Sequence, residues 1–153
     1  MRYVITILSV LFFLISCNIN NTEKFYYSQF VKYMQETQQQ SEATIEYYYI
    51  LHLQGCNSCI ENSLKFLQSI DDSIKSKFLV ILVGEYVGNS MAYIKAIETL
   101  KEEYNCIEDY YQEIFKYQTG FAYPLFIRVK NKKCIQYEEM INLKYESILN
   151  SLK

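Results

Sequence analysis

Residues 44–59 read TIEYYYILHLQGCNSC, and this segment decides the fold class of the chain. Its first ten residues are almost continuously apolar and rich in β-branched and aromatic side chains. That pattern predicts a strand buried on both faces, in the middle of a sheet that has helices on each side. Cys56 and Cys59 follow directly, and apolar residues then recur at helical spacing. The segment therefore predicts a strand, a CxxC turn and a helix.

Strand and helix patterns continue to alternate on both sides of this segment. The expected strands cover residues 44–53, 77–83, 106–107, 124–129 and 134–137. The expected helices cover residues 23–40, 60–70, 90–104, 109–117 and 143–152. Strands that alternate with helices and end in a hairpin and a helix predict an α/β layered sheet.

The CxxC spacing has a physical meaning at the start of a helix. Residues three apart share a helix face, so the sulfurs of Cys56 and Cys59 can come within bonding distance. The first turn also carries unpaired N–H groups and about half a positive charge, which lower a thiol pKa below its free value of roughly 8.5. Because a thiolate is the form that attacks a disulfide, the pattern indicates a nucleophile at Cys56 and a resolving thiol at Cys59. A structural disulfide on an inactive scaffold is the alternative.

Composition excludes several classes of function. The chain of 153 residues suits one domain. Lys and Arg number 15 against 17 for Asp and Glu, so no excess positive charge is present to bind nucleic acid. With only four glycines and no GxGxxG or GxxxxGK[ST] motif, a phosphate-binding loop is not expected. We expect no cofactor.

The N-terminus has the pattern of a secretory signal. Arg2 precedes an apolar run over residues 3–15, which is shorter than the roughly 20 residues that span a bilayer as a helix. The run ends in LISC, which resembles the lipobox of bacterial lipoproteins and implies lipidation of Cys17. An ordinary cleaved signal or a retained short anchor are the alternatives. The expected division is a lipoprotein signal peptide over 1–16, a tether over 17–22 and one domain over 23–153.

This interpretation places the protein outside the cytoplasm, on a membrane, where paired cysteines are more often disulfides than zinc ligands. For Cys106 and Cys134 the sequence leaves open free thiols, one structural disulfide or a second redox pair. The separations of His52, the CxxC pair and these two cysteines match no compact zinc site. No neighbouring His/Met cluster completes a copper site, so no metal is expected.

The order of strand, CxxC, helix, strand, helix, strand after proline, hairpin and helix resembles the thioredoxin superfamily over roughly residues 44–153. The resemblance implies a thioredoxin-like layered sheet and thiol–disulfide oxidoreductase activity. It also implies a cis-proline that faces the CxxC, and Pro124 is the single proline of the chain. Tyr123 and Pro124 are accordingly the expected substrate contacts. The additional helix over 90–104 is similar to an insertion in membrane-tethered reductases of this superfamily.

Four positions depart from the family pattern. Gly55 stands where the family often has Trp, and Asn57–Ser58 stand where it often has Gly-Pro. Ile50 occupies the place of a buried acid. His52, otherwise a core histidine satisfied by a hydrogen bond, and Glu61 remain as candidates for the missing proton acceptor.

The expected function is a membrane-tethered thiol–disulfide oxidoreductase that acts on protein or small thiols and disulfides, with a lipid anchor as its membrane contact. The alternative is a non-enzymatic envelope lipoprotein that keeps the scaffold and a structural disulfide for binding or assembly.

Overall fold

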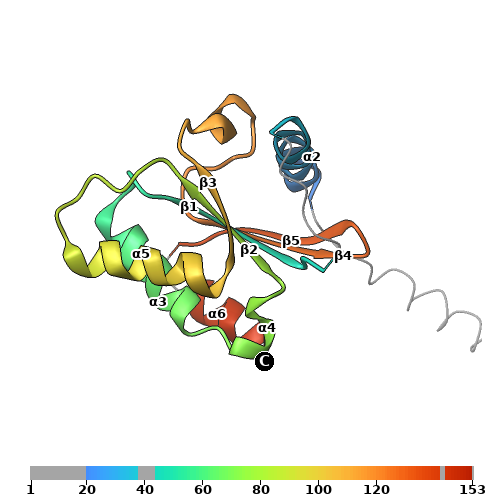
Figure 1. The fold of residues 1–153 in the computed structure, drawn as a ribbon. Helices are drawn as coiled ribbons and strands as arrows, with labels where there is room; N and C mark the ends of the chain where they lie inside the picture. Colours follow the sequence, from blue (N-terminus) through green and yellow to red (C-terminus); the bar gives the residue numbers. More distant parts are fainter. Residues whose placement is uncertain (1–19, 38–43, 142–143, 153) are drawn as a thin grey trace, which may run out of the picture.

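The computed structural model describes residues 20–37, 44–141 and 144–152 (Figure 1). The helices are α2 (Asn21–Glu36), α3 (Asn57–Gln68), α4 (Asp72–Lys75), α5 (Met91–Glu103), the 3₁₀-helix η1 (Glu113–Lys116) and α6 (Lys144–Ser151). The strands are β1 (Tyr47–His52), β2 (Phe78–Val83), β3 (Asn105–Asp109), β4 (Leu125–Lys130) and β5 (Lys133–Glu139). This arrangement confirms the predicted α/β class.

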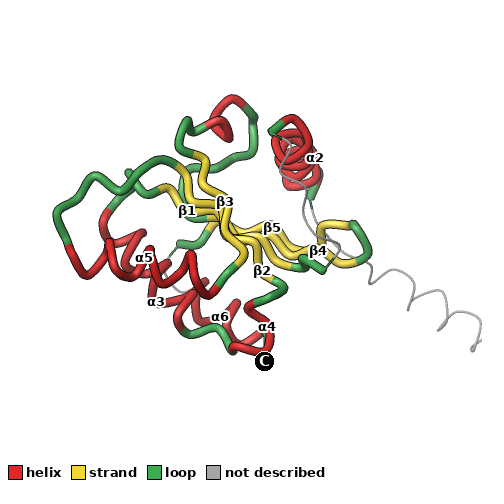
Figure 2. The backbone as a smooth tube through the Cα atoms, in the orientation of Figure 1, coloured by secondary structure: helices red, strands yellow, loops and turns green. Residues whose placement is uncertain are grey.

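The five strands form one mixed sheet (Figure 2), in the order β3-β2-β1-β4-β5. β1, β2 and β3 run parallel to one another, whereas β4 is antiparallel to β1 and β5 is antiparallel to β4. β1 lies in the centre of the sheet, as its apolar sequence predicts. Every residue of β2 is buried, and so are all residues of β1 except the last, His52.

Helices cover both faces of the sheet (Figure 1). Tyr47, Tyr49 and Leu51 of β1 pack in a core with side chains of α3, α5 and α6. Tyr48 and Ile50 point the other way, into a core with side chains of α2 and η1. Because side chains alternate along a strand, a strand that is buried on both faces must be apolar at nearly every position.

The helices begin or end at residues other than the expected ones, and two of these differences have an identifiable cause. α2 begins two residues before the expected start because Asn20 closes a capping box with Glu23, whose backbone N–H donates to Asn20 Oδ1 at 2.8 Å. The helix expected over 109–117 is reduced to the single turn of η1, since Asp109 is the last residue of β3. A short helix that was not expected, α4, follows its N-cap Asp71.

The expected signal peptide and residues 17–19 of the expected tether lie outside the described residues, Cys17 among them, whereas Asn21 and Thr22 of that tether belong to α2. Within the described ranges, no helix combines the length and apolar character that a membrane span requires.

Candidate redox site

Cys56 and Cys59 lie where β1 leads into α3. Cys56 is the N-cap residue of α3, with extended backbone angles (φ −70°, ψ 139°), and Cys59 is the third residue of the helix. The two Sγ atoms form a disulfide, with 5.2 Å between the Cα atoms. The structure thus confirms that this spacing brings the two sulfurs together.

The N-terminus of α3 contacts the Cys56 sulfur directly. The backbone N–H of Cys59 donates to Cys56 Sγ at 3.1 Å, and Ser58 Oγ lies 3.4 Å from the same sulfur. Cys56 is exposed, whereas Cys59 is half-buried. A donor at the N-cap sulfur stabilises negative charge there, and a partner molecule reaches Cys56 before Cys59.

A buried serine beneath the disulfide was missed by the sequence analysis. Ser63 is 0% exposed, and its hydroxyl donates to the backbone oxygen of Cys59 at 2.6 Å. The hydroxyl of Tyr49 donates to Ser63 Oγ at 2.8 Å, and that of Tyr145 lies 3.5 Å from it. The available signal was a serine within the apolar stripe of a helix, four residues after the second cysteine.

Pro124 lies at the same end of the sheet as the cysteines. Leu125 pairs with Ile50 in antiparallel register, so the preceding Pro124 is level with the last residues of β1. Pro124 is buried, and its carbonyl accepts a hydrogen bond from the Met140 N–H at 2.6 Å. Tyr123 beside it is 45% exposed. The register therefore brings both predicted contact residues to the end of the sheet from which β1 leads to the CxxC.

The expectation of a cis peptide bond before Pro124 is wrong, because every peptide bond in the described ranges is trans. An X–Pro bond favours trans by about 0.5–1 kcal/mol. With a trans bond before Pro124, strand β4 still begins at Leu125, and the Pro124 carbonyl still accepts a hydrogen bond from the Met140 N–H.

Neither open candidate for the proton acceptor is well placed. His52 lies on the sheet face opposite α3, where its ring packs edge-on against Phe115 with centroids 5.1 Å apart. Its Nε2 is buried without a hydrogen-bond partner in the described part of the chain, contrary to expectation, and burial lowers the His52 pKa. Glu61 binds Lys65 Nζ at 2.6 Å and the Tyr93 hydroxyl at 3.3 Å. The hydrogen bond from Lys65 lowers the Glu61 pKa, which makes this carboxylate a weak base.

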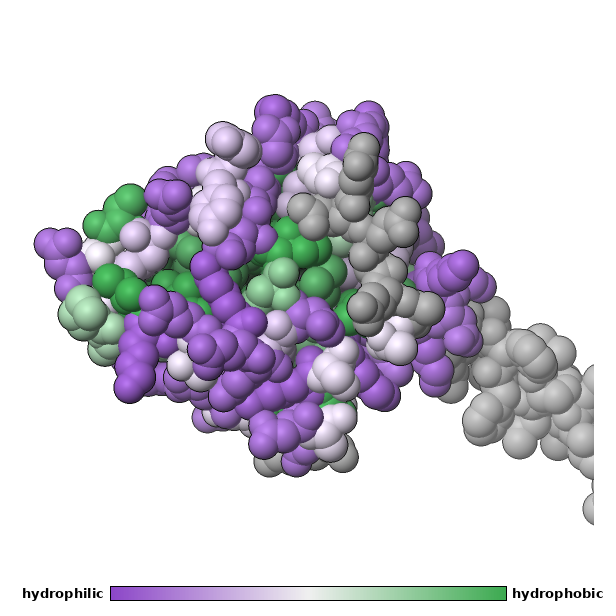
Figure 3. Space-filling view, viewed as in Figure 1, coloured by the Kyte–Doolittle hydropathy of each residue, from purple (hydrophilic) through white to green (hydrophobic). Residues whose placement is uncertain are grey.

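Most of the exposed large apolar side chains in the described ranges lie in segments at the cysteine end of the sheet. Of seven large apolar residues exposed in the described ranges, six lie in segments at this end, and only Phe25 on α2 does not. We call these six residues the apolar rim: Val87, Met91, Tyr110, Tyr111, Phe115 and Tyr123. Figure 3 shows apolar residues on the surface near the β2–α5 loop, at the left of the view.

Two amide side chains bridge the ends of the parallel strands. Gln112 Nε2 donates to Gln54 Oε1 at 3.0 Å, so the chain after β3 is tied to the chain after β1. Gly84, which follows β2, lies against this pair and has a φ of 75°. A Cβ atom at this position would lie 3.3 Å from Gln112 Nε2. Gln112 itself has a left-handed backbone, φ 56°. The glycine gives the amide pair room.

Cys106 and Cys134 are free thiols on opposite edges of the sheet, in β3 and β5. Four strand spacings separate these edges by about 19 Å, whereas a disulfide requires Cα atoms within about 7 Å. The structure thus excludes a disulfide between them. Burial raises the pKa of each thiol to about 11, so both are protonated at neutral pH.

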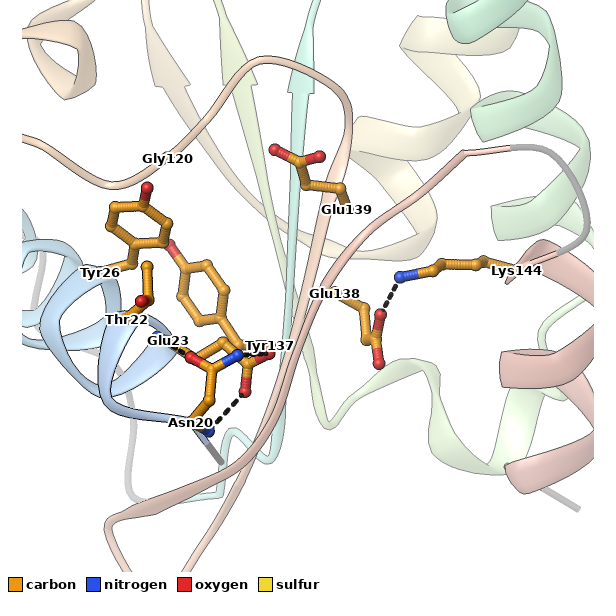
Figure 4. Close-up of a pocket in the computed structure, with 9 residues that line it drawn as sticks. All are labelled: Asn20, Thr22, Glu23, Tyr26, Gly120, Tyr137, Glu138, Glu139 and Lys144. Carbon is orange, nitrogen blue, oxygen red and sulfur yellow. Dashed lines mark hydrogen bonds and ion pairs between the residues drawn. The ribbon is translucent and has the colours of Figure 1, made fainter. Parts of the chain in front are cut away.

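A separate pocket of about 290 Å³ lies among the start of α2, β5 and α6 (Figure 4). Tyr26 and Tyr137 form one wall, and Glu138 forms an ion pair with Lys144. None of its lining residues belongs to the CxxC or to the apolar rim. Within the described ranges, no three His, Cys, Asp or Glu side chains are grouped to hold a metal ion.

A scan against protein-family models, a search of curated proteins and a search of solved structures each found no match to this chain. The chemistry of the site is therefore inferred from its geometry.

Proposed function

We propose that this protein is a thiol–disulfide oxidoreductase with a thioredoxin-like fold. The observation that carries the proposal is the Cys56–Cys59 disulfide at the N-terminus of α3, with the Cys56 sulfur exposed and in contact with a helix N–H group. The order of elements around it, which supports the proposal, resembles that of the family: the central β1, α3, β2, α5, Pro124, the β4–β5 hairpin and α6, with α4 between α3 and β2 and with β3 and η1 between α5 and Pro124.

The proposed reaction transfers two electrons from the protein to the disulfide of its partner. In the reduced protein the Cys56 thiolate attacks a partner disulfide, forms a mixed disulfide and releases one partner thiolate. Cys59 then attacks the Cys56 sulfur, which forms the Cys56–Cys59 bond and releases the second partner thiolate. The partner gains two electrons and the protein loses two, and an external dithiol returns them. The reverse sequence oxidises a partner dithiol.

The apolar rim favours a polypeptide partner over a small thiol. Tyr111 is 88% exposed and Val87 is 75% exposed. Clusters of exposed apolar side chains are typical of surfaces that contact another protein. A small thiol such as glutathione has little apolar surface to bury against them.

The main test measures disulfide exchange by the purified, reduced protein. We expect it to reduce insulin in the presence of dithiothreitol faster than dithiothreitol alone, and to equilibrate with a glutathione redox series. An exchange rate no greater than that of a free small thiol would contradict the proposal. That result would favour the alternative, a binding or assembly protein with a structural disulfide.

A second measurement tests the partner class. We expect the pair Val87→Ser and Tyr111→Ser to lower the rate with insulin several-fold and to leave the rate with a small disulfide unchanged. Phe25→Ser is the matched control, because Phe25 is also exposed but lies on α2. Equal losses on both substrates would indicate that the rim does not bind polypeptides.

We propose further that Cys17 carries the lipid anchor and holds the protein to a membrane outside the cytoplasm. The support is the LISC sequence at the end of the apolar run. Each buried acyl CH₂ group contributes about 0.8 kcal/mol, so two chains suffice for stable anchoring. We expect Cys17→Ser to abolish incorporation of labelled palmitate in cells. An undiminished signal would reject Cys17 as the attachment site.

A further inference from the structure

Ser63 connects the redox site to the interior through a chain of hydroxyl groups. Three elements supply these groups, since Tyr49 belongs to β1, Ser63 to α3 and Tyr145 to α6. Ser63 has a single O–H, which donates to Cys59 O at 2.6 Å. Its oxygen must therefore act as the acceptor toward Tyr49, at 2.8 Å, and toward Tyr145, at 3.5 Å.

The bonds of this network all have the same direction. Each hydrogen points toward Cys59, from Tyr49 to Ser63 and from Ser63 to the Cys59 carbonyl. Hydrogen bonds in such a chain polarise one another in a low-dielectric interior. The hydrogen-donating end of the chain thus lies at the backbone carbonyl of Cys59, in the first turn of α3.

Cys59 is held on both sides of its Cα. Its carbonyl accepts from Ser63, and its N–H donates to Cys56 Sγ at 3.1 Å. The Ser63 hydroxyl thus restrains Cys59 on the carbonyl side of its Cα, and on the other side the N–H is shared between Cys56 O, at 2.9 Å, and Cys56 Sγ. Ile50 stands where the family has an acid, and the Glu61 carboxylate is engaged by Lys65. Of the buried polar side chains in the described ranges, Ser63, Asp109 and Thr119, Ser63 is the one hydrogen-bonded to a residue of the pair.

We propose that Ser63 is a positioning residue of the redox site, which orients the Cys59 peptide groups so that they stabilise the thiolate of the reduced protein. This inference rests on the proposed function. Tyr49 and Tyr145 act through Ser63 by holding its hydroxyl toward Cys59.

The test is a titration of the reduced protein, followed by thiolate absorbance at 240 nm. Burial raises the pKa of Cys106 and of Cys134 to about 11, so in a Cys17→Ser background, which lacks the fifth thiol of the chain, the transition below pH 9 belongs to the CxxC pair. We expect Ser63→Ala to raise the pKa of Cys56 by about 0.3–0.7 unit, the size of a helix-terminus effect. The equilibrium with glutathione should shift toward the disulfide by the corresponding factor of about 2–5.

Three further variants separate positioning from general stability. Ser63→Thr keeps a hydroxyl and should restore the wild-type pKa. Ser69→Ala removes the same type of bond, from Ser69 Oγ to Lys65 O at 2.7 Å, at the far end of α3 and should leave the pKa unchanged. Tyr49→Phe keeps the ring, should shift the pKa in the same direction, and serves as the test if Ser63→Ala does not fold.

The outcomes distinguish this inference from the proposed function. If the wild-type protein exchanges disulfides but Ser63→Ala and Tyr49→Phe both titrate as the wild type does, the positioning role of Ser63 is wrong and the oxidoreductase proposal stands. If the wild-type protein does not exchange, the proposed function fails whatever the titrations show. A shift of equal size in Ser69→Ala would also overturn the inference.

Discussion

Cys56→Ser is expected to reduce disulfide exchange to the uncatalysed rate, whereas Cys59→Ser should trap a mixed disulfide with the partner. The asymmetry follows from the geometry of the two cysteines, because Cys56 is exposed at the N-cap of α3 and Cys59 is half-buried in its first turn. An incoming partner therefore bonds to Cys56, and Cys59 is needed only to release it. With serine at position 59 no second thiol can attack the mixed disulfide.

Non-reducing gel electrophoresis and peptide mass spectrometry identify the trapped bond. We expect a partner linked through Cys56, and we expect the double variant Cys106→Ser and Cys134→Ser to exchange as the wild type does, since both thiols are free, partly buried and remote from each other in the sheet. A trapped partner linked to Cys106 or Cys134, or rapid exchange by Cys56→Ser, would refute the assignment of the nucleophile.

Asp109→Ala is expected to destabilise the fold by about 2–4 kcal/mol, because it leaves buried donors without an acceptor. Asp109 is only 7% exposed. Its carboxylate accepts hydrogen bonds from the N–H groups of Glu113 and Ile114, at 2.8 and 3.0 Å, and from the Tyr33 hydroxyl at 3.3 Å. One side chain thus joins β3, η1 and α2.

Urea unfolding measures this loss as a shift of the midpoint with an unchanged slope. Tyr33→Phe removes only the phenol bond and should cost about 1 kcal/mol. Asp72→Ala, at an exposed carboxylate that binds Lys75, should stay within about 0.5 kcal/mol. A loss at Asp109→Ala no larger than that at Asp72→Ala would show that the junction does not hold the three elements together.

Much of the framework could be predicted from local patterns. Residues 44–53 and 77–83 are apolar at nearly every position, and they contain the strands β1 (Tyr47–His52) and β2 (Phe78–Val83), which are buried on two faces. The cysteines at 56 and 59 fall at the start of a helix because Cys56 itself caps it. Such features depend only on residues close together in the sequence, so the sequence alone predicts them. The start of α2 depended on its cap, Asn20, and that of η1 on Asp109, which ends β3 and whose carboxylate accepts from the first N–H groups of η1.

The chain by itself determined where the central strand, the CxxC turn and the helix after it would form, since periodicity and the N-cap position are local properties. Only the tertiary structure decided the strand order that places Cys106 and Cys134 on opposite edges. The packing of β1, α3 and α6 likewise brought the hydroxyls of Tyr49 and Tyr145 to Ser63 beneath the disulfide. These contacts join residues up to 82 positions apart, and no local pattern specifies which distant side chains will meet in a shared core.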